Sequence, residues 1–430
     1  MRYALINPNW SFEGSIYFGC REPHLPLEFG YSKTLLEAAG HEAIVIDGQL
    51  DALTPEEIRL RIIDARPDFS VITTAPSYLF WRCAPPELRV PRDLIQQVGD
   101  AGGKWIAVGP HASTTPKTTL RKLGVHAVVM GECEEILPQF AGPLWQVQSV
   151  CYSVNGDAWI QGGTHASDMT KLPALRWPLE TVSRHNHHHH RFEASPKGPG
   201  AELESSRGCP YHCTFCAKDN FRDKYRRRPV STVMEEIDGL LEQGVEYFYF
   251  IDEIFLPNKE LLEGLVERRE RRDLKIGLQT RIDLWSEEML TLLGRAGCVS
   301  IEAGVESITE EGRAELDKKC KMTTQQLADR LIFAKQHVPF VQANLIEMEQ
   351  DDLEAVDQFR DQLQQHGVWA NKPVPLYPYP GSPDYTKRWG QPDENAWERA
   401  HDYYLQLYAE FSDIQESQPR PLRELELSCA

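Results

Sequence analysis

The sequence lacks both a long hydrophobic run and an excess of positive charge. No stretch approaches the ~20 consecutive apolar residues that a membrane-spanning helix needs, and 46 Lys and Arg residues against 64 Asp and Glu residues give a formal net charge of −18. A nucleic-acid surface needs a basic patch that replaces counterions. We therefore expect neither a membrane nor a nucleic-acid partner. Because the amino terminus begins with a strand pattern instead of a signal peptide, we expect a cytoplasmic protein.

Cysteine pairs at disulfide spacing are also missing from most of the chain. Of the ten cysteines, all but one group of three are scattered along the sequence. Scattered cysteines indicate a reducing compartment. The scattered residues are Cys20, Cys83, Cys133, Cys151, Cys298, Cys320 and Cys429.

The other three cysteines form a Cys-x3-Cys-x2-Cys triplet, Cys209, Cys213 and Cys216. Three thiolates with no fourth cysteine nearby favour a 4Fe-4S cluster that keeps one iron open for a non-protein ligand. A structural zinc site would want a second pair of ligands, although His212 inside the triplet leaves that alternative open. An electron-transfer cluster would want a fourth cysteine.

The triplet resembles the motif of the radical S-adenosylmethionine (SAM) superfamily, including an aromatic residue, Phe215, before the last cysteine. The resemblance implies that the open iron chelates the amino and carboxylate groups of SAM. It also implies that Phe215 packs near the adenine of SAM.

The first part of the chain alternates strand and helix patterns. Strand patterns begin near Tyr3, Ala43, Ser70, Trp105 and His126, and helix patterns lie between them, with a further helix expected from Glu134. This alternation predicts an α/β fold with a parallel sheet that binds its ligand at the carboxyl ends of the strands.

The strand ends of this region resemble those of the cobalamin-binding domain that precedes the radical SAM barrel in one subclass. The resemblance implies cobalamin contacts from residues in three turns, which are Ser77, Tyr78, Gly109, Pro110, His111, Gly131 and Glu132. The Asp-x-His-x-x-Gly signature of classical cobalamin enzymes is absent. We therefore expect cobalt without a histidine ligand, with His111 as the alternative. A flavodoxin-like domain that binds another planar cofactor, or none, also stays open.

From Glu202 onward, six strand–helix units predict a partial (β/α)6 barrel of the TIM type, with functional side chains at the carboxyl ends of the strands. Carboxylates at such ends can also be helix caps or salt bridges. The family resemblance instead assigns them to SAM binding. The implied SAM contacts are Asp252, Glu253, Arg281, Glu302, Glu306, Ser307 and Asn344.

The full organisation expected is a Rossmann-like (flavodoxin-like) cobalamin-binding domain over residues 1–141, a linker over 142–200, the radical SAM barrel over 201–385 and a helical segment over 386–430. Within the linker we expect a small hairpin near 149–160. The linker also carries a histidine run, His187–His190, for which a solvated loop is the simplest interpretation and contact with substrate or cofactor the alternative. The aromatic residues from Trp397 onward predict an amphipathic helix.

The resemblance implies a cobalamin-dependent radical SAM methyltransferase. The 5′-deoxyadenosyl radical would remove hydrogen from an unactivated carbon of a small metabolite, and methylcobalamin would deliver the methyl group. A second SAM would remethylate cobalamin, and an external donor such as flavodoxin or ferredoxin would supply electrons. Alternatives are a ring-forming or rearranging enzyme with the same cofactors, a methylthiotransferase, and an iron–sulfur carrier. The sequence does not identify the substrate.

Overall fold

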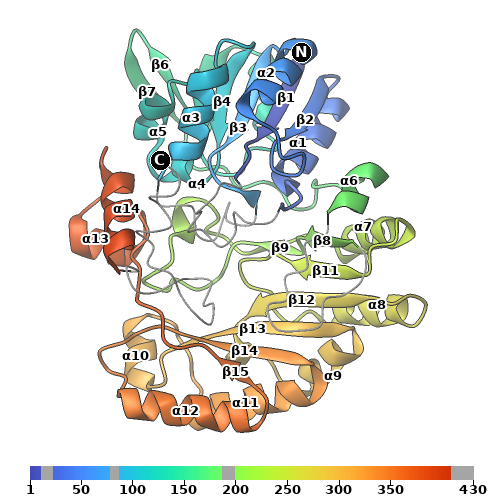
Figure 1. Cartoon of the computed structure of the whole chain (residues 1–430), viewed down its shortest axis with the longest axis vertical. Helices are drawn as coiled ribbons and strands as arrows, with labels where there is room; N and C mark the ends of the chain where they lie inside the picture. Colours follow the sequence, from blue (N-terminus) through green and yellow to red (C-terminus); the bar gives the residue numbers. More distant parts are fainter. Residues whose placement is uncertain (11–22, 78–86, 186–198, 408–430) are drawn as a thin grey trace. The chain divides into compact units, whose positions relative to one another are not determined.

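The computed structural model of the protein describes residues 1–10, 23–77, 87–185 and 199–407 (Figure 1). Its contacts divide the chain into two units. The first consists of Met1–Leu175, Cys216–Lys224 and Tyr377–Ala430, and the second of Arg176–Phe215 and Tyr225–Leu376. Tyr78, Cys20, Cys83, Cys429 and the histidine run His187–His190 lie outside the described residues.

The sheet of the first unit begins with five parallel strands in the order β2-β1-β3-β4-β5, as the sequence predicts. These strands are mostly apolar and buried, which is typical of a parallel sheet covered on both faces. Their bounds are β1 Arg2–Asn7, β2 Glu42–Asp47, β3 Phe69–Thr73, β4 Lys104–Val108 and β5 Ala127–Val129.

The helices of this unit lie between the strands in sequence. Thr54 begins α2 with a capping box, in which its hydroxyl accepts from the amide of Glu57 and the Glu57 carboxylate accepts from the amide of Thr54. The helices are α1 Leu27–Ala38, α2 Pro55–Ala65, α3 Arg89–Val98, α4 Pro110–Thr114 and α5 Pro116–Leu123. Apolar side chains of α2, α3 and α5 join those of β1 and β4 in one buried core.

The expected helix from Glu134 does not form. Residues 134–136 make a turn, and a 3-10 helix, η3 (Leu137–Ala141), follows it. Pro138 explains the difference, because it has no amide hydrogen to bond the carbonyl of Glu134, as an α-helix would require.

The expected hairpin near 149–160 forms and extends the sheet. Strands β6 (Val150–Val154) and β7 (Asp157–Gln161) pair antiparallel, and β6 pairs antiparallel with β5. Asn155 and Gly156 both have positive φ, 53° and 91°, which suits the type I′ turn that Asn-Gly favours between two strands. The sheet of the first unit therefore continues to Gln161, inside the stretch that we expected to be linker.

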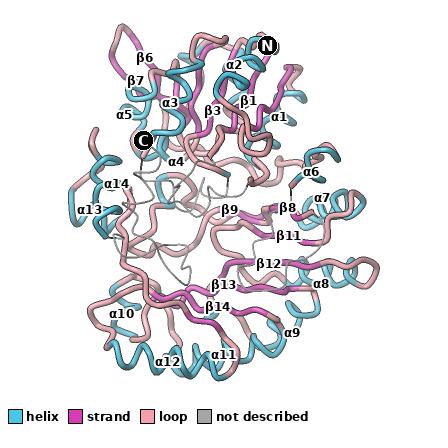
Figure 2. Tube along the Cα trace, in the orientation of Figure 1, coloured by secondary structure: helices cyan, strands magenta, loops and turns pink. Residues whose placement is uncertain are grey.

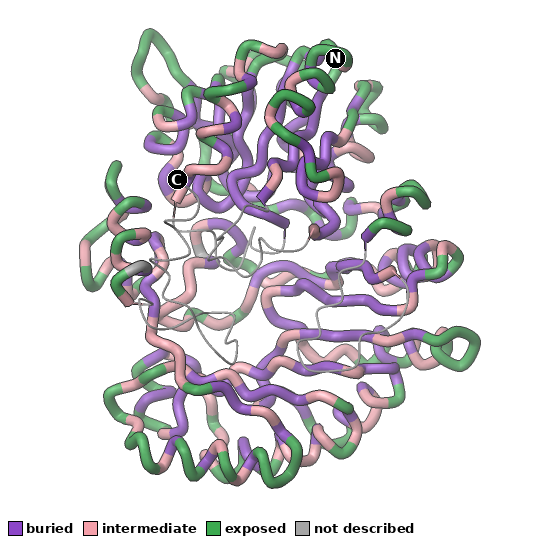
Figure 3. Tube along the Cα trace, viewed as in Figure 1, coloured by how far each residue is buried: buried purple, intermediate pink, exposed green. Residues whose placement is uncertain are grey.

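The second unit contains a parallel sheet in the order β8-β11-β12-β13-β14-β15, and the predicted strand–helix alternation is present (Figure 2). Its strands are β8 Gly200–Leu203, β11 Tyr247–Phe250, β12 Lys275–Thr280, β13 Cys298–Glu306, β14 Phe340–Leu345 and β15 Trp369–Ala370. The connecting helices are α7 Val230–Glu242, α8 Lys259–Arg269, α9 Glu287–Arg295, α11 Thr324–His337 and α12 Leu353–Gln365. Figure 3 shows the strands largely buried and the outer faces of these helices exposed.

The described chain also contains shorter elements. In the second unit these are α6 (Leu179–Arg184), α10 (Glu310–Glu315) and an antiparallel pair of β9 (Ser206–Arg207) and β10 (Arg226–Arg227). The first unit adds α13 (Pro383–Trp389) and α14 (Ala396–Leu407), and α14 is the described part of the helix expected from Trp397. In the part of the chain that the structure describes, no helix is long and apolar enough to cross a membrane.

Candidate cofactor sites

The cysteine triplet occupies the loop between β9 and β10. Two hydrogen bonds within the second unit fix this loop: the amide of Gly208 donates to Glu253 Oε2 at 2.9 Å, and the amide of Thr214 donates to the carbonyl of Leu316 at 3.1 Å. Gly208 has φ +78°, a conformation that glycine adopts without strain. The three cysteines are partly exposed thiols. Cys216 opens the segment grouped with the first unit.

Two buried cations of the second unit act on the cluster loop. The Arg281 guanidinium lies 4.0 Å from the centre of the Tyr211 ring and pairs with Asp283 at 2.7 Å. Lys318 pairs with Glu306 and is also buried. Burial raises the pKa of the Cys213 thiol to about 11, while the positive charges of Lys318 and Arg281 act in the opposite direction.

Asp252 lies two residues after the end of β11 and is held by the segment that leads to the cluster loop. Its carboxylate accepts from the amide and hydroxyl of Ser205, at 2.8 and 2.6 Å, and from the hydroxyl of Ser206 at 2.5 Å. Burial raises the pKa of Asp252 to about 7, against the effect of these hydrogen bonds. Asp252 therefore holds the chain just before the cluster loop, and Glu253 holds the loop itself at Gly208.

Glu302 belongs to a row of polar side chains across neighbouring strands. Gln279 on β12 is its register partner and donates to Glu302 Oε2 at 2.8 Å. Gln342 on β14 is the register partner on the other side and donates to Asn344 Oδ1. Glu302 and Asn344 are thus ordered by amide donors on the same sheet.

Glu306 and Ser307 lie where β13 leaves regular pairing. The register shifts between Gly304 and Glu306, and Glu306 has φ +65°. Ser307 Oγ donates to Asp351 Oδ1 at 2.7 Å, and the amides of Ile308 and Thr309 donate to the same carboxylate. In the structure Ser307 is therefore part of a turn organised by Asp351.

The first unit has its own candidate site at the carboxyl ends of its parallel strands. The strand order is that of the flavodoxin-like fold, in which ligands bind where the order reverses, between β1 and β3. Ser77, which follows β3, donates to Glu28 Oε2 at 2.8 Å and accepts from the amide of Leu27 at 3.3 Å. It thereby ties the end of β3 to the start of α1.

His111 is buried against α14 within the first unit. Gly109, with φ +126°, precedes α4, in which Pro110 is the first residue and His111 the second. The centres of the His111 and Trp397 rings are 4.2 Å apart, and Trp397 Nε1 donates to Thr115 Oγ1 at 2.7 Å. His111 itself has no exposed surface. These contacts give His111 a packing role.

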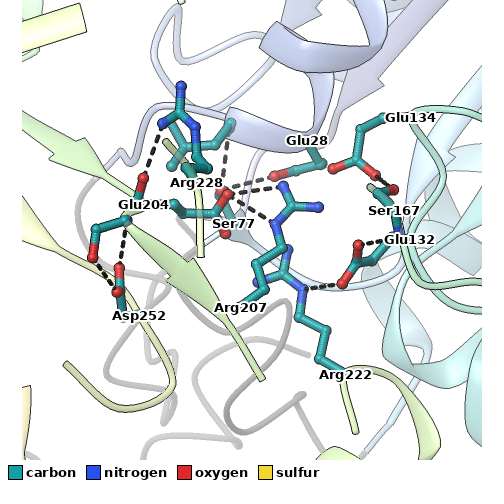
Figure 4. Close-up of polar contacts among 12 residues, drawn as sticks. Glu28, Ser77, Glu132, Glu134, Ser167, Glu204, Arg207, Arg222, Arg228 and Asp252 are labelled. Carbon is teal, nitrogen blue, oxygen red and sulfur yellow. Dashed lines mark hydrogen bonds and ion pairs between the residues drawn. The ribbon is translucent and has the colours of Figure 1, made fainter. Parts of the chain in front are cut away.

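Gly131 and Glu132 hold the segment around His165. Gly131 has φ +86°, and a Cβ there would lie 2.2 Å from the carbonyl oxygen of His165. Glu132 accepts from the amide of Ser167 at 2.8 Å and pairs with Arg222 at 3.5 Å (Figure 4). The close approach of the His165 backbone therefore requires glycine at position 131, independently of any cofactor.

The structure adds residues that sequence patterns did not single out. Tyr211, Lys318 and Asp351 contact predicted SAM residues, and Arg222 contacts a predicted cobalamin residue. No spacing in the sequence links these pairs. Only the presence of Tyr211 inside the triplet could have indicated one of them.

The residues present fit an iron–sulfur cluster and its ligand. The donor set is three partly exposed thiols on one short loop, beside the buried cations Arg281 and Lys318. Such surroundings suit thiolate ligands. Among the described residues, no group of three or more His, Cys, Asp or Glu side chains is arranged to hold a single metal ion. In the first unit, the strand ends of a flavodoxin-like sheet fit a large planar cofactor.

Two family models match the chain, one within the first unit and one largely within the second. Residues 203–359 match the model described as the radical SAM superfamily, and residues 21–141 match the B12 binding domain. An uncharacterized methyltransferase of Pyrococcus horikoshii is 24% identical over 322 residues, covering 72% of this chain and 66% of that protein. The anaerobic magnesium-protoporphyrin IX monomethyl ester cyclase of Rubrivivax gelatinosus is 25% identical over 348 residues, covering 77% of this chain and 60% of that protein. The chain thus spans less than two thirds of each relative.

Solved structures share the fold of the described chain. The radical SAM methyltransferase TsrM from Kitasatospora setae, solved with tryptophan substrate and a SAM analogue, has a TM-score of 0.73 at 17% identity and covers 90% of this chain and 76% of its own. The cobalamin-dependent radical enzyme OxsB with aqua-cobalamin has a TM-score of 0.69 at 15% identity, covering 95% of this chain and 67% of its own. The two matched domains imply a 4Fe-4S cluster, SAM and cobalamin as cofactors. Residues 203–359 are thus a radical SAM domain, and a B12 binding domain precedes it over residues 21–141.

Proposed function

We propose that the protein is a cobalamin-dependent radical SAM methyltransferase that methylates an unactivated carbon of a small molecule. The observation that carries the proposal is the triplet Cys209, Cys213 and Cys216 in a radical SAM domain whose chain also holds a B12 binding domain. The relatives named as methyltransferases and the neighbour solved with tryptophan support the reaction and the substrate class.

When bound, the cluster with SAM supplies a carbon-centred radical that removes a hydrogen atom, and methylcobalamin supplies the methyl group. The protein's part is to fix the reacting groups in place. Glu253 and Leu316 fix the backbone of the cluster loop at Gly208 and Thr214. Side chains of the second unit offer polar groups for SAM, among them Arg281, Glu302, Glu306 and Asn344.

We propose that Phe215 packs near the adenine of SAM. Asp252, Glu253 and Ser307 act indirectly, since they bond the chain segments that lead to the cluster loop or leave β13. At the carboxyl ends of β3, β4 and β5 we assign cobalamin to the turns of Ser77, Tyr78, Gly109, Pro110, His111, Gly131 and Glu132.

We expect His111 not to ligate cobalt, because its ring is buried against Trp397. Electron paramagnetic resonance of cob(II)alamin on the protein should show no nitrogen superhyperfine splitting, with the nucleotide tail displaced. Splitting that disappears in His111→Ala would make His111 the ligand. Splitting that survives this change would indicate the cofactor's own base or another histidine.

A cyclase or rearranging enzyme with the same cofactors is the second candidate. It is favoured by the match to the anaerobic magnesium-protoporphyrin cyclases of Rubrivivax gelatinosus and Cereibacter sphaeroides, at 25% and 24% identity. For either reaction we propose a cytoplasmic protein that receives electrons from an external donor such as flavodoxin or ferredoxin. The net charge of −18 argues against a nucleic-acid partner.

Anaerobic incubation of reconstituted, cobalamin-loaded protein with SAM and dithionite tests the proposal. We expect 5′-deoxyadenosine from radical formation and S-adenosylhomocysteine from remethylation of cobalamin. A rearranging enzyme should give the first product without the second, and an iron–sulfur carrier should give neither. Protein that retains no cobalamin after gel filtration would contradict the methyltransferase proposal. As a control, Cys298→Ala leaves the triplet complete and should give the same products as wild type.

A further inference from the structure

We propose that Arg281 is a positioning residue that keeps its positive charge on the cluster loop by stacking on Tyr211, and that this charge makes the cluster easier to reduce. The inference rests on the cluster assignment in the proposed function, but assigns Arg281 a role apart from binding SAM. Its starting point is the 4.0 Å between the Arg281 guanidinium and the centre of the Tyr211 ring.

The two partners come from different elements of the second unit. Tyr211 lies inside the triplet, between Cys209 and Cys213, whereas Arg281 follows β12 directly. A guanidinium over an aromatic face within ~6 Å is attracted by the ring quadrupole, more strongly when the pair is removed from water. Arg281 is 6% exposed. The stack therefore connects a rigid strand end to the loop that carries the cluster ligands.

Asp283 fixes the direction of the guanidinium. It accepts from Arg281 Nε at 3.1 Å and from Nη2 at 2.7 Å, a two-point contact that orients the planar group. Asp283 is itself buried. With one edge bonded to Asp283, the flat face of the guanidinium remains for the Tyr211 ring.

Arg281 contacts the loop through Tyr211, and Lys318 lies two residues after Leu316, whose carbonyl accepts from the amide of Thr214. Lys318 is paired with Glu306 and Arg281 with Asp283, so each cation near the loop has one carboxylate partner. Of the two cations, Arg281 is the one stacked on a residue of the loop itself.

A fixed cation favours the more negative state of a nearby redox centre. Reduction adds one electron to the cluster, and its potential depends on net charge and surroundings. A unit charge at about 10 Å, with an effective dielectric constant near 20, changes such an equilibrium on the order of tenfold. Removal of the Arg281 charge should therefore lower the fraction of reduced cluster at a given potential.

The test is a reductive titration of the reconstituted full chain without SAM or cobalamin, followed by electron paramagnetic resonance of the reduced cluster. We expect Arg281→Gln to lower the ratio of reduced to oxidised cluster about tenfold at fixed potential, which is about 59 mV for a one-electron couple. Tyr211→Phe keeps the ring and should stay within about twofold of wild type. Tyr211→Leu should lower the ratio at least threefold, because Asp283 alone then holds the guanidinium, which can move away from the loop.

A double variant tests whether Tyr211 and Arg281 act through one stack or through two independent effects. Tyr211→Leu combined with Arg281→Gln should lower the ratio no further than Arg281→Gln alone, since both changes remove the same charge from the loop. The matched control is Arg268→Gln on α8, a cation paired with Asp238, which should leave the ratio unchanged. A larger, additive loss in the double variant would overturn the proposal.

The outcomes distinguish this proposal from the proposed function. Wild-type protein that binds no cluster contradicts the cluster assignment and the proposal together. A loaded Arg281→Gln variant with an unchanged ratio overturns the role of Arg281 alone. If Arg281→Gln takes up no iron, the comparison of Tyr211→Leu with Tyr211→Phe decides: a lower ratio in the leucine variant supports the proposal, and equal ratios overturn it.

Discussion

Replacing Cys209, Cys213 or Cys216 with alanine is expected to abolish the formation of 5′-deoxyadenosine. A three-cysteine cluster has one open iron for SAM, and loss of one thiolate removes a ligand that no nearby cysteine replaces. Wild-type protein should hold about four irons per chain after anaerobic reconstitution. Each variant should fall well below that content, measured by iron and sulfide analysis beside the product assay.

Two other cysteines provide matched controls. Cys298 is buried on β13 and Cys320 is partly buried near α11, and neither is in the triplet. Cys298→Ala and Cys320→Ala should keep the iron content and product formation of wild type. A triplet variant that still made 5′-deoxyadenosine would show that the cluster is held by other residues.

The strand–helix order could be predicted because buried parallel strands are short apolar runs. Tyr247–Phe250 is a run of aromatic residues with no exposed side chain, and α8 after it begins with the cap residue Asn258. The same reasoning located the parallel strands of the first unit. It misassigned the segment from Glu134, where acidic residues suggested a helix start but Pro138 prevented it.

The partners of the site residues could not be predicted, since they lie far apart in the sequence. Ser307 and Asp351 are 44 residues apart, and Asp252 bonds Ser205 across 47. Side-chain periodicity indicates which face of a strand is buried, but not which loop of another strand–helix unit meets its end. The motif therefore identified Cys209, Cys213 and Cys216, whereas the stack of Arg281 on Tyr211 required the fold.

Replacing Arg228 with methionine is expected to destabilise the second unit by about 3–5 kcal/mol, because it breaks a buried ion pair from one side. Arg228 Nη2 lies 2.7 Å from Glu236 Oε2, and both side chains have no exposed surface. Arg228 Nη1 also donates to the carbonyl of Glu204 at 2.9 Å. Urea unfolding and hydrogen exchange at the α7 amides should both report the loss.

A second change should restore most of that stability. Arg228→Met with Glu236→Leu replaces the pair by apolar groups and should return to within about 1 kcal/mol of wild type, since the cost of the single variant comes from the carboxylate left behind. The control is Arg268→Met, whose pair with Asp238 has side chains 21% and 49% exposed, and it should cost no more than about 1 kcal/mol. Equal losses in Arg228→Met and Arg268→Met would contradict the claim that burial decides the effect. A double variant no more stable than Arg228→Met would mean that the bond to the Glu204 carbonyl, next to the strand pair that flanks the cluster loop, is the contact that matters.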